Sequence, residues 1–184
     1  LLGVGLLDTP AEERFDRITR LAADHFGVPI AAITLIDADR QWCKSGAGLA
    51  GLESSRAVSF CAHAILHPDA ATVVPDTTED PRFADNPLVT GPPHVRFYAG
   101  HPIKAPAGEP LGTLCLIDIA PHELDDRQIA RLADLAAWVE EEIRRDDDRT
   151  AADQLRDSEA RVWTLMNSVA EGIVAVSGDG WIVG

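Results

Sequence analysis

A heptad pattern in the last third of the chain sets the strongest constraint on its fold. Apolar residues recur there at steps of three and four, the spacing of a helix with one apolar seam. The sequence offers this seam no obvious partner, so we expect a second copy of the chain to cover it in a parallel homodimer through the terminal helices. The residues of this predicted dimer seam are Ile129, Leu132, Ala136, Val139 and Ile143.

A second apolar set follows the seam after a run of charged residues at 144–149. Its heptad phase differs from that of the first set, and such a phase slip lets a coiled coil hold two registers. The alternative is that the heptad pattern simply ends where a flexible linker begins. The acids of the charged run lack the spacing of a calcium loop and predict a solvated surface. The second set consists of Leu155, Val162 and Val169.

The C-terminal residues predict a β-hairpin. Residues 172–176 and 181–183 are apolar and β-branched, and Asp179–Gly180 between them is a frequent two-residue turn. Because the pattern stops there, we expect the start of a further domain whose remaining strands are absent.

Composition excludes several classes of function. The net charge is −14, from 30 acidic and 16 basic residues, which disfavours binding to nucleic acids or anionic lipids. No segment approaches the roughly 18 apolar residues of a membrane span, and residues 1–7 lack the features of a signal peptide. The three cysteines have no metal-binding spacing and fit a reducing compartment. We therefore expect a cytoplasmic protein.

The remaining patterns predict an α+β fold. Apolar runs predict strands at 30–36, 41–45, 72–74, 95–104 and 111–117, with helices from Thr9, over 60–66, and from Asp125. Ser59 and Asp125 suit N-caps, the latter with Gln128 in a capping box, and Thr9 suits the cap of the first helix. Residues 76–93 predict a long loop. This order gives an antiparallel sheet of about five or six strands with the N- and C-terminal helices on one face.

Six stretches with these elements resemble the GAF domain family of signalling proteins. They are residues 7–18, 33–37, 59–65, 80–87, 97–102 and 112–118. Residues 165–173, with Asp179–Gly180, are similar to the opening of a PAS domain. The resemblance divides the chain into a GAF-like sensory domain at 1–145, a helical linker at 146–160 and a truncated PAS start at 161–184.

The resemblance also implies a function. It implies a regulatory domain that binds a small molecule, dimerises, or does both, and so controls a downstream PAS domain and an output such as a diguanylate cyclase, histidine kinase or phosphatase. The chain lacks the acidic pattern of cyclic-nucleotide binders and the Cys-His dipeptide of bilin binders, so the cofactor stays unknown. We expect no catalytic residue and no metal site in this segment. A ligand-free structural dimerisation module is the alternative.

In a GAF-like fold the ligand pocket lies between the long loop and the sheet. Aromatic, histidine and cysteine side chains gather in these segments and are the candidate ligand-binding residues, although the loop could equally close over a filled core. They are Phe60, Cys61, Phe83, Phe97, Tyr98, His101 and Cys115.

Three other readings of these segments stay open. Cys61 with His63 and His67 could form a metal or redox site, although a buried cysteine is more often a small apolar residue. Cys61 and Cys115 are the pair that a thiol-based reductase of this family would use. Arg82 or Arg96 could clamp an anion, whereas a solvated loop arginine is the simpler interpretation.

Overall fold

The computed structural model describes residues 5–48 and 53–176. Their contacts divide the chain after Arg144 into two compact units. The first unit contains the sheet, and the second begins at Arg145 within the last helix.

Six strands form a single antiparallel sheet in the order β3-β2-β1-β6-β5-β4. The predicted α+β fold is therefore confirmed. The strands are β1 (Ile30–Ile36), β2 (Arg40–Ala47), β3 (Ser54–Ser55), β4 (Thr72–Val74), β5 (Phe97–Lys104) and β6 (Pro110–Asp118). The helices are α1 (Glu13–Phe26), η1 (Arg56–Val58), α2 (Phe60–Ala64), α3 (Pro87–Thr90) and α4 (Asp126–Val176).

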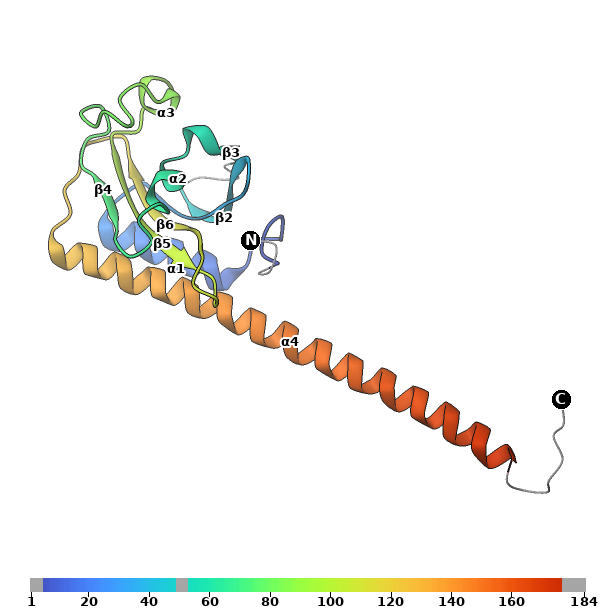
Figure 1. Cartoon of the computed structure of the whole chain (residues 1–184). Coiled ribbons are helices and arrows are strands. Elements are labelled where there is room, and N and C mark those ends of the chain that lie inside the picture. Colours follow the sequence, from blue (N-terminus) through green and yellow to red (C-terminus); the bar gives the residue numbers. More distant parts are fainter. Residues whose placement is uncertain (1–4, 49–52, 177–184) are drawn as a thin grey trace. The chain divides into compact units, whose positions relative to one another are not determined.

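Strand alternation divides the apolar core into two layers, because successive side chains point to opposite faces of a sheet. In β6, Leu114 and Leu116 belong to the layer beneath α1 and the first part of α4, whereas Cys115 belongs to the layer beneath α2. Figure 1 shows α1 and the start of α4 side by side along the sheet. We call these layers the helix face and the α2 face.

The predicted dimer seam lies inside the chain's own core. Leu132, Ala136, Val139 and Ile143 are at most 1% exposed and share the helix-face cluster with Phe15 and Ile18 of α1 and with strand residues, while Ile129 is half-buried. The prediction that these residues form a seam between two copies is therefore wrong. The heptad spacing correctly identified a helix with one apolar face, but the sheet and α1 cover that face.

Helix α4 begins as predicted. Gln128 N–H donates to Asp125 Oδ1 and Asp125 N–H donates to Gln128 Oε1, at 2.7 and 2.9 Å, which completes a capping box. The helix then continues to Val176, so residues 172–176 are helical and the predicted strand there is wrong. A growing helix gains one hydrogen bond per residue, whereas a strand needs a partner. Residues 177–184, with the predicted Asp179–Gly180 turn, lie outside the described residues.

The first helix begins four residues later than Thr9. Its N-cap residue is Glu12, whose side chain makes no capping hydrogen bond. Thr9 Oγ1 instead donates to Leu6 O at 2.7 Å and accepts a hydrogen bond from Lys44 of β2. The prediction of a Thr9 cap is wrong because a partner distant in sequence takes up this hydroxyl.

Candidate functional site

Three aromatic rings fill the centre of the α2 face. The Phe60 ring lies 4.7 Å from that of Phe83 and 5.2 Å from that of Tyr98, and all three side chains are at most 3% exposed. Ser59 Oγ caps α2 by accepting from Ala62 N–H at 3.0 Å, which fixes Phe60 and Cys61 over the sheet. This part of the predicted site is a packed aromatic cluster.

Five of the seven predicted site residues come together here, and two do not. Phe60, Cys61, Phe83, Tyr98 and Cys115 all belong to the α2-face cluster. Phe97 lies in the helix-face layer, with its ring 5.1 Å from that of His122, and His101 has the same parity in β5. Their assignment to the α2 face is wrong, because neighbours of Tyr98 at odd spacing point to the opposite side of the strand.

The thiols of two cysteines and the hydroxyls of two threonines and Tyr98 lie together on the sheet side of this cluster. Cys61 and Cys115 belong to this cluster, and Thr34 of β1 and Thr113 of β6 point to the same face of the sheet. The two threonine hydroxyls, from β6 and β1, lie 3.2 Å apart. Both threonines were missed in the sequence, although Thr113 lies two residues from Cys115 in one strand and therefore shares its face.

The Tyr98 hydroxyl is buried among these groups without a hydrogen-bond partner of good geometry in the described structure. Gly100 makes room for it, since a Cβ at that position would lie 2.1 Å from the phenol oxygen. Burial raises the pKa of Tyr98 well above its usual value, and the neighbouring Cys61 raises it further. The phenol therefore stays protonated and acts as a donor.

The two thiols differ in acidity. Burial raises the pKa of Cys61, but hydrogen bonds from Cys115, Thr113 and Thr34 outweigh it, so the pKa lies below that of an ordinary thiol. The hydrogen bond to Cys61, together with burial, raises the pKa of Cys115 well above its usual value.

The other sequence candidates have local partners. The His63 ring packs edge-on against Phe83 at 5.0 Å. Arg82 pairs with Asp80, and Arg96 with Asp76. Within the described ranges, no group of three or more His, Cys, Asp or Glu side chains is arranged to hold a metal ion.

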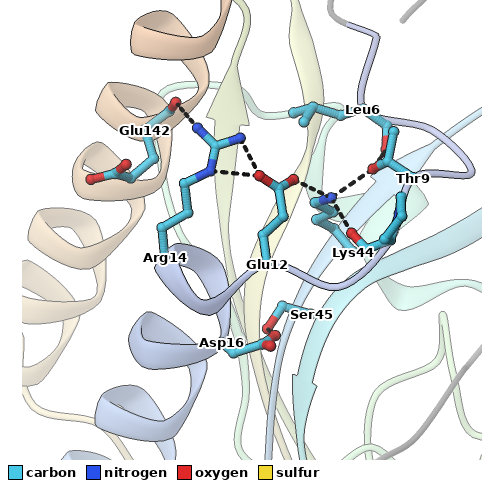
Figure 2. Close-up of polar contacts among 9 residues, drawn as sticks. Leu6, Thr9, Glu12, Arg14, Asp16, Lys44, Ser45 and Glu142 are labelled. Carbon is cyan, nitrogen blue, oxygen red and sulfur yellow. Dashed lines mark hydrogen bonds and ion pairs between the residues drawn. The ribbon is translucent and has the colours of Figure 1, made fainter.

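A second polar constellation lies on the helix face and was missed in the sequence. Lys44 is the extra residue of a β-bulge between the pairs Ile33–Ser45 and Thr34–Cys43, and a bulge re-aims the side chain it carries. The Lys44 side chain is 1% exposed. Its ammonium group lies 2.6 Å from Glu12 Oε1 and donates to Thr9 Oγ1 at 2.6 Å and Pro10 O at 2.8 Å (Figure 2).

This network continues to α4. Glu12 Oε2 pairs with Arg14 at 2.6 Å, and Arg14 donates to the backbone carbonyl of Glu142 at 3.0 Å (Figure 2). Partial burial raises the pKa of Glu12, but hydrogen bonds from Lys44 and Arg14 prevail and hold it below its usual value. We call Lys44, Glu12 and Arg14 the ion clamp. It joins strand β2 to the start of α1 and to α4.

Residues 10–143 match the family model described as GAF domain. The chain belongs to the GAF domain family. The GAF domain is also 44% identical over 137 residues to a cyclic di-GMP phosphodiesterase of Pseudomonas aeruginosa. That match covers 74% of this chain but only 23% of the relative. The expectation of a regulatory GAF domain related to signalling proteins is confirmed.

Solved structures share the fold at low sequence identity. The GAF domain of PixJ from Thermosynechococcus elongatus superposes with a TM-score of 0.60 at 10% identity, over 79% of this chain and 89% of that one. A free methionine-R-sulfoxide reductase of Neisseria meningitidis gives 0.59 at 18% identity, over 74% and 78%. A domain of a sensor histidine kinase from Sinorhizobium meliloti gives 0.57 at 15%, over 79% and 97%. These similarities establish the fold alone. No described helix of this GAF domain is long and apolar enough to cross a membrane.

Proposed function

We propose that this GAF domain is the sensory input of a larger signalling protein and controls an output enzyme that acts on cyclic di-GMP. The observation that carries the proposal is the continuity of α4. Its first part is buried in the core of the domain, and the same uninterrupted helix extends to Val176. We propose that a change in core packing is passed along this helix to residues 145–176. The relationship to the Pseudomonas phosphodiesterase supports the choice of output.

The second unit supplies a dimer interface in place of the seam that the core covers. Leu155 and Val162 are 61% and 53% exposed on α4. From Leu155 onward, the positions reached by alternating steps of four and three residues are apolar, except for one acid. This spacing is typical of a coiled coil. These positions are Leu155, Glu159, Val162, Met166, Val169, Ile173 and Val176. We propose a parallel homodimer along this stripe, with residues 146–160 as its helical linker and a PAS domain following it.

Light scattering of the purified chain tests the dimer. We expect a dimer for the natural sequence and a monomer for Leu155→Glu combined with Val162→Glu. Glu159→Leu should strengthen dimerisation, because a buried acid weakens the interface. Asp157→Leu removes the same charge from a position outside the stripe and should leave dimerisation unchanged. A monomer at all concentrations, or equal effects of the two leucine variants, would overturn the stripe.

A domain exchange tests the regulatory role. The matching segment of the Pseudomonas phosphodiesterase is replaced by residues 10–143 of this chain, and hydrolysis of cyclic di-GMP is measured. We expect the chimaera to stay active and a chimaera with the destabilising Lys44→Met substitution to differ by at least about fivefold, the size of a small allosteric coupling. Identical rates for the exchange, the substitution and a deletion of the segment would contradict the proposal.

The α2 face is the proposed ligand site, through Phe60, Cys61, Phe83, Tyr98 and Cys115. Native mass spectrometry tests it, since a bound metabolite adds its mass to that of the polypeptide. The close contacts among the three rings favour a second candidate, a ligand-free dimerisation module. A dimer at bare polypeptide mass in cell-derived and metabolite-supplemented samples alike would support that module.

The presence of Cys61 and Cys115 in one buried cluster favours the thiol-based reductase as a third candidate. Turnover of free methionine sulfoxide with dithiothreitol, lost in Cys61→Ser, would support an enzyme. No turnover in the natural chain would exclude this substrate.

A further inference from the structure

Groups that can donate hydrogen bonds share the α2 face with the sulfur of Cys61. The thiol of Cys115 and the hydroxyl of Thr113 come from β6, and the hydroxyl of Thr34 comes from β1. The Tyr98 phenol of β5 lies against Gly100, which pairs with Cys115 across the sheet. A thiol is a weak acceptor and uses few donors, whereas a thiolate or a sulfur-bound oxygen accepts several. The surroundings of Cys61 are thus built for a negatively charged or oxygenated sulfur.

The Tyr98 hydroxyl, which has no hydrogen-bond partner of good geometry among the described residues, is a second observation in favour of this interpretation. A buried hydroxyl without a partner is costly, and most proteins avoid it. Here Gly100 keeps space for the phenol at the expense of a side chain of its own. The phenol gains an acceptor once Cys61 loses its proton or carries an oxygen atom. The free-energy cost of burying this hydroxyl without a partner is then removed when Cys61 is ionised or oxidised.

We propose that Cys61 and Cys115 form a redox site that reduces a hydroperoxide and closes to an intramolecular disulfide. The thiolate of Cys61 attacks the outer oxygen of the hydroperoxide, the O–O bond breaks, and the alkoxide leaves and takes up a proton. Cys61 then carries a sulfenic acid, which the Tyr98 and threonine hydroxyls can hold. The sulfur of Cys115 attacks this sulfenic sulfur, and hydroxide leaves with the proton of Cys115 as water. Overall two thiols are oxidised and one hydroperoxide becomes an alcohol and water.

Burial determines which reagents reach the site. Cys61 and Cys115 are 2% and 1% exposed, whereas Cys43 is half-buried. We expect hydrogen peroxide, which is small and uncharged, to reach the buried thiols through a smaller opening of the five-residue helix α2 than a bulky maleimide requires. The folded chain should therefore resist alkylation at Cys61 and yet react with peroxide. This inference concerns the chemistry of the α2 face and does not rest on the proposed output.

The test uses the full chain with Cys43→Ser, which removes the one thiol outside the pair. Folded protein is treated with hydrogen peroxide, the peroxide is destroyed with catalase, and the chain is unfolded in urea with N-ethylmaleimide. Before treatment we expect two alkylated thiols. Afterwards we expect none, a mass lower by two hydrogen atoms, and a peptide in which Cys61 is linked to Cys115. Retention of both thiols while free glutathione is fully oxidised would overturn the proposal, as would linkage only between separate chains.

Two variants separate this mechanism from mere proximity of two thiols. Cys115→Ser should leave the sulfenic acid at Cys61, where dimedone traps it, whereas Cys61→Ser should leave Cys115 unoxidised. Tyr98→Phe keeps the ring but removes the donor, and it should slow peroxide consumption at neutral pH about tenfold, the effect of one hydrogen bond to a charged group. Circular dichroism verifies that each variant is folded. Equal rates for Tyr98→Phe and the parent would exclude the role of the phenol.

Discussion

Each face of the sheet holds one buried polar group that stands out, and the two groups differ in their hydrogen bonding. On the helix face, the ammonium group of Lys44 has three donors and three partners, Glu12, Thr9 and Pro10. On the α2 face, the Tyr98 hydroxyl has no partner of good geometry in the described structure, although it is equally buried. A fully satisfied network fixes one arrangement of its elements. An unsatisfied group instead favours any change that supplies its missing partner.

This difference suggests that the two faces of the sheet have different roles. The ion clamp holds β2, the start of α1 and the carbonyl of Glu142 in α4 together on the helix face. The α2 face carries groups whose hydrogen bonding changes with the charge of Cys61. We infer that the α2 face receives the signal and the helix face transmits it.

Lys44→Met should have the largest effect on stability. Methionine keeps the apolar stem, but the substitution leaves Thr9, Pro10 and Glu12 without their shared donor. Loss of one member of a buried ion pair costs about 3–5 kcal/mol, and because Glu12 is about one-third exposed we expect the lower end, ~3 kcal/mol. Urea denaturation followed by circular dichroism measures the free energy of unfolding.

Arg20→Met is the control for Lys44→Met. Arg20 also pairs with a glutamate, Glu13, but its side chain is 54% exposed. A solvent-exposed ion pair adds little to stability, so this variant should unfold almost like the natural chain. If both methionine variants lost the same small amount, the clamp would be no stronger than a surface pair, and the contrast between the faces would fail.

Gly100→Ala tests the space that the structure keeps for the phenol of Tyr98. The added Cβ would lie 2.1 Å from the phenol oxygen and 2.7 Å from the ring carbon that bears it. Overpacking of a core costs about 1–3 kcal/mol, so we expect a loss of ~2 kcal/mol in unfolding free energy. In a Tyr98→Phe background the oxygen is gone and the loss should be smaller. Equal losses in the two backgrounds would show that the strain comes from the ring or the backbone.

Local chemistry explains which elements the sequence could predict. Ser59, Asp125 and Gln128 cap helices through hydrogen bonds to residues within three positions, so their roles are readable from spacing. Lys44 owes its burial to a bulge and to partners more than thirty residues away, which spacing does not encode. The heptad spacing showed that α4 has an apolar face, but whether a sheet or a second copy covers that face depends on tertiary structure.

The candidate site was predictable to the same extent. Strand alternation was available for Phe97 and Tyr98, which adjoin in one strand and so point to opposite faces. It would also have placed Thr113 beside Cys115. Nothing in the sequence indicated that the Tyr98 hydroxyl lacks a partner, because that depends on the packing of α2 over three strands.

Tyr98→Phe should stabilise the reduced domain, in contrast to removal of the buried polar group at Lys44. The variant removes a buried hydroxyl that lacks a good partner, so the folded state no longer bears the cost of dehydrating it. We expect a gain of about 1 kcal/mol in unfolding free energy, measured by urea denaturation in the presence of a reductant at a pH low enough to keep the Cys61 thiol protonated. A loss of similar size would mean that the phenol makes a stabilising hydrogen bond to Cys61 in the thiol form, and the two faces would then be alike.

Acid should weaken the ion clamp by the smallest amount. The pKa of Glu12 is lower in the folded chain than in the unfolded chain, so its contribution is complete above the ordinary carboxyl pKa and is lost as pH falls through the lowered value. Because Glu12 is partly exposed, we expect this contribution to be below about 1 kcal/mol. The difference in unfolding free energy between the natural chain and Glu12→Gln should shrink as pH falls from 7 through the carboxyl range. Other carboxylates titrate equally in both chains and cancel from the difference. A difference that stays constant with pH would mean that the charge of Glu12 is unimportant, and that Lys44 is held by the neutral acceptors Thr9 and Pro10 alone.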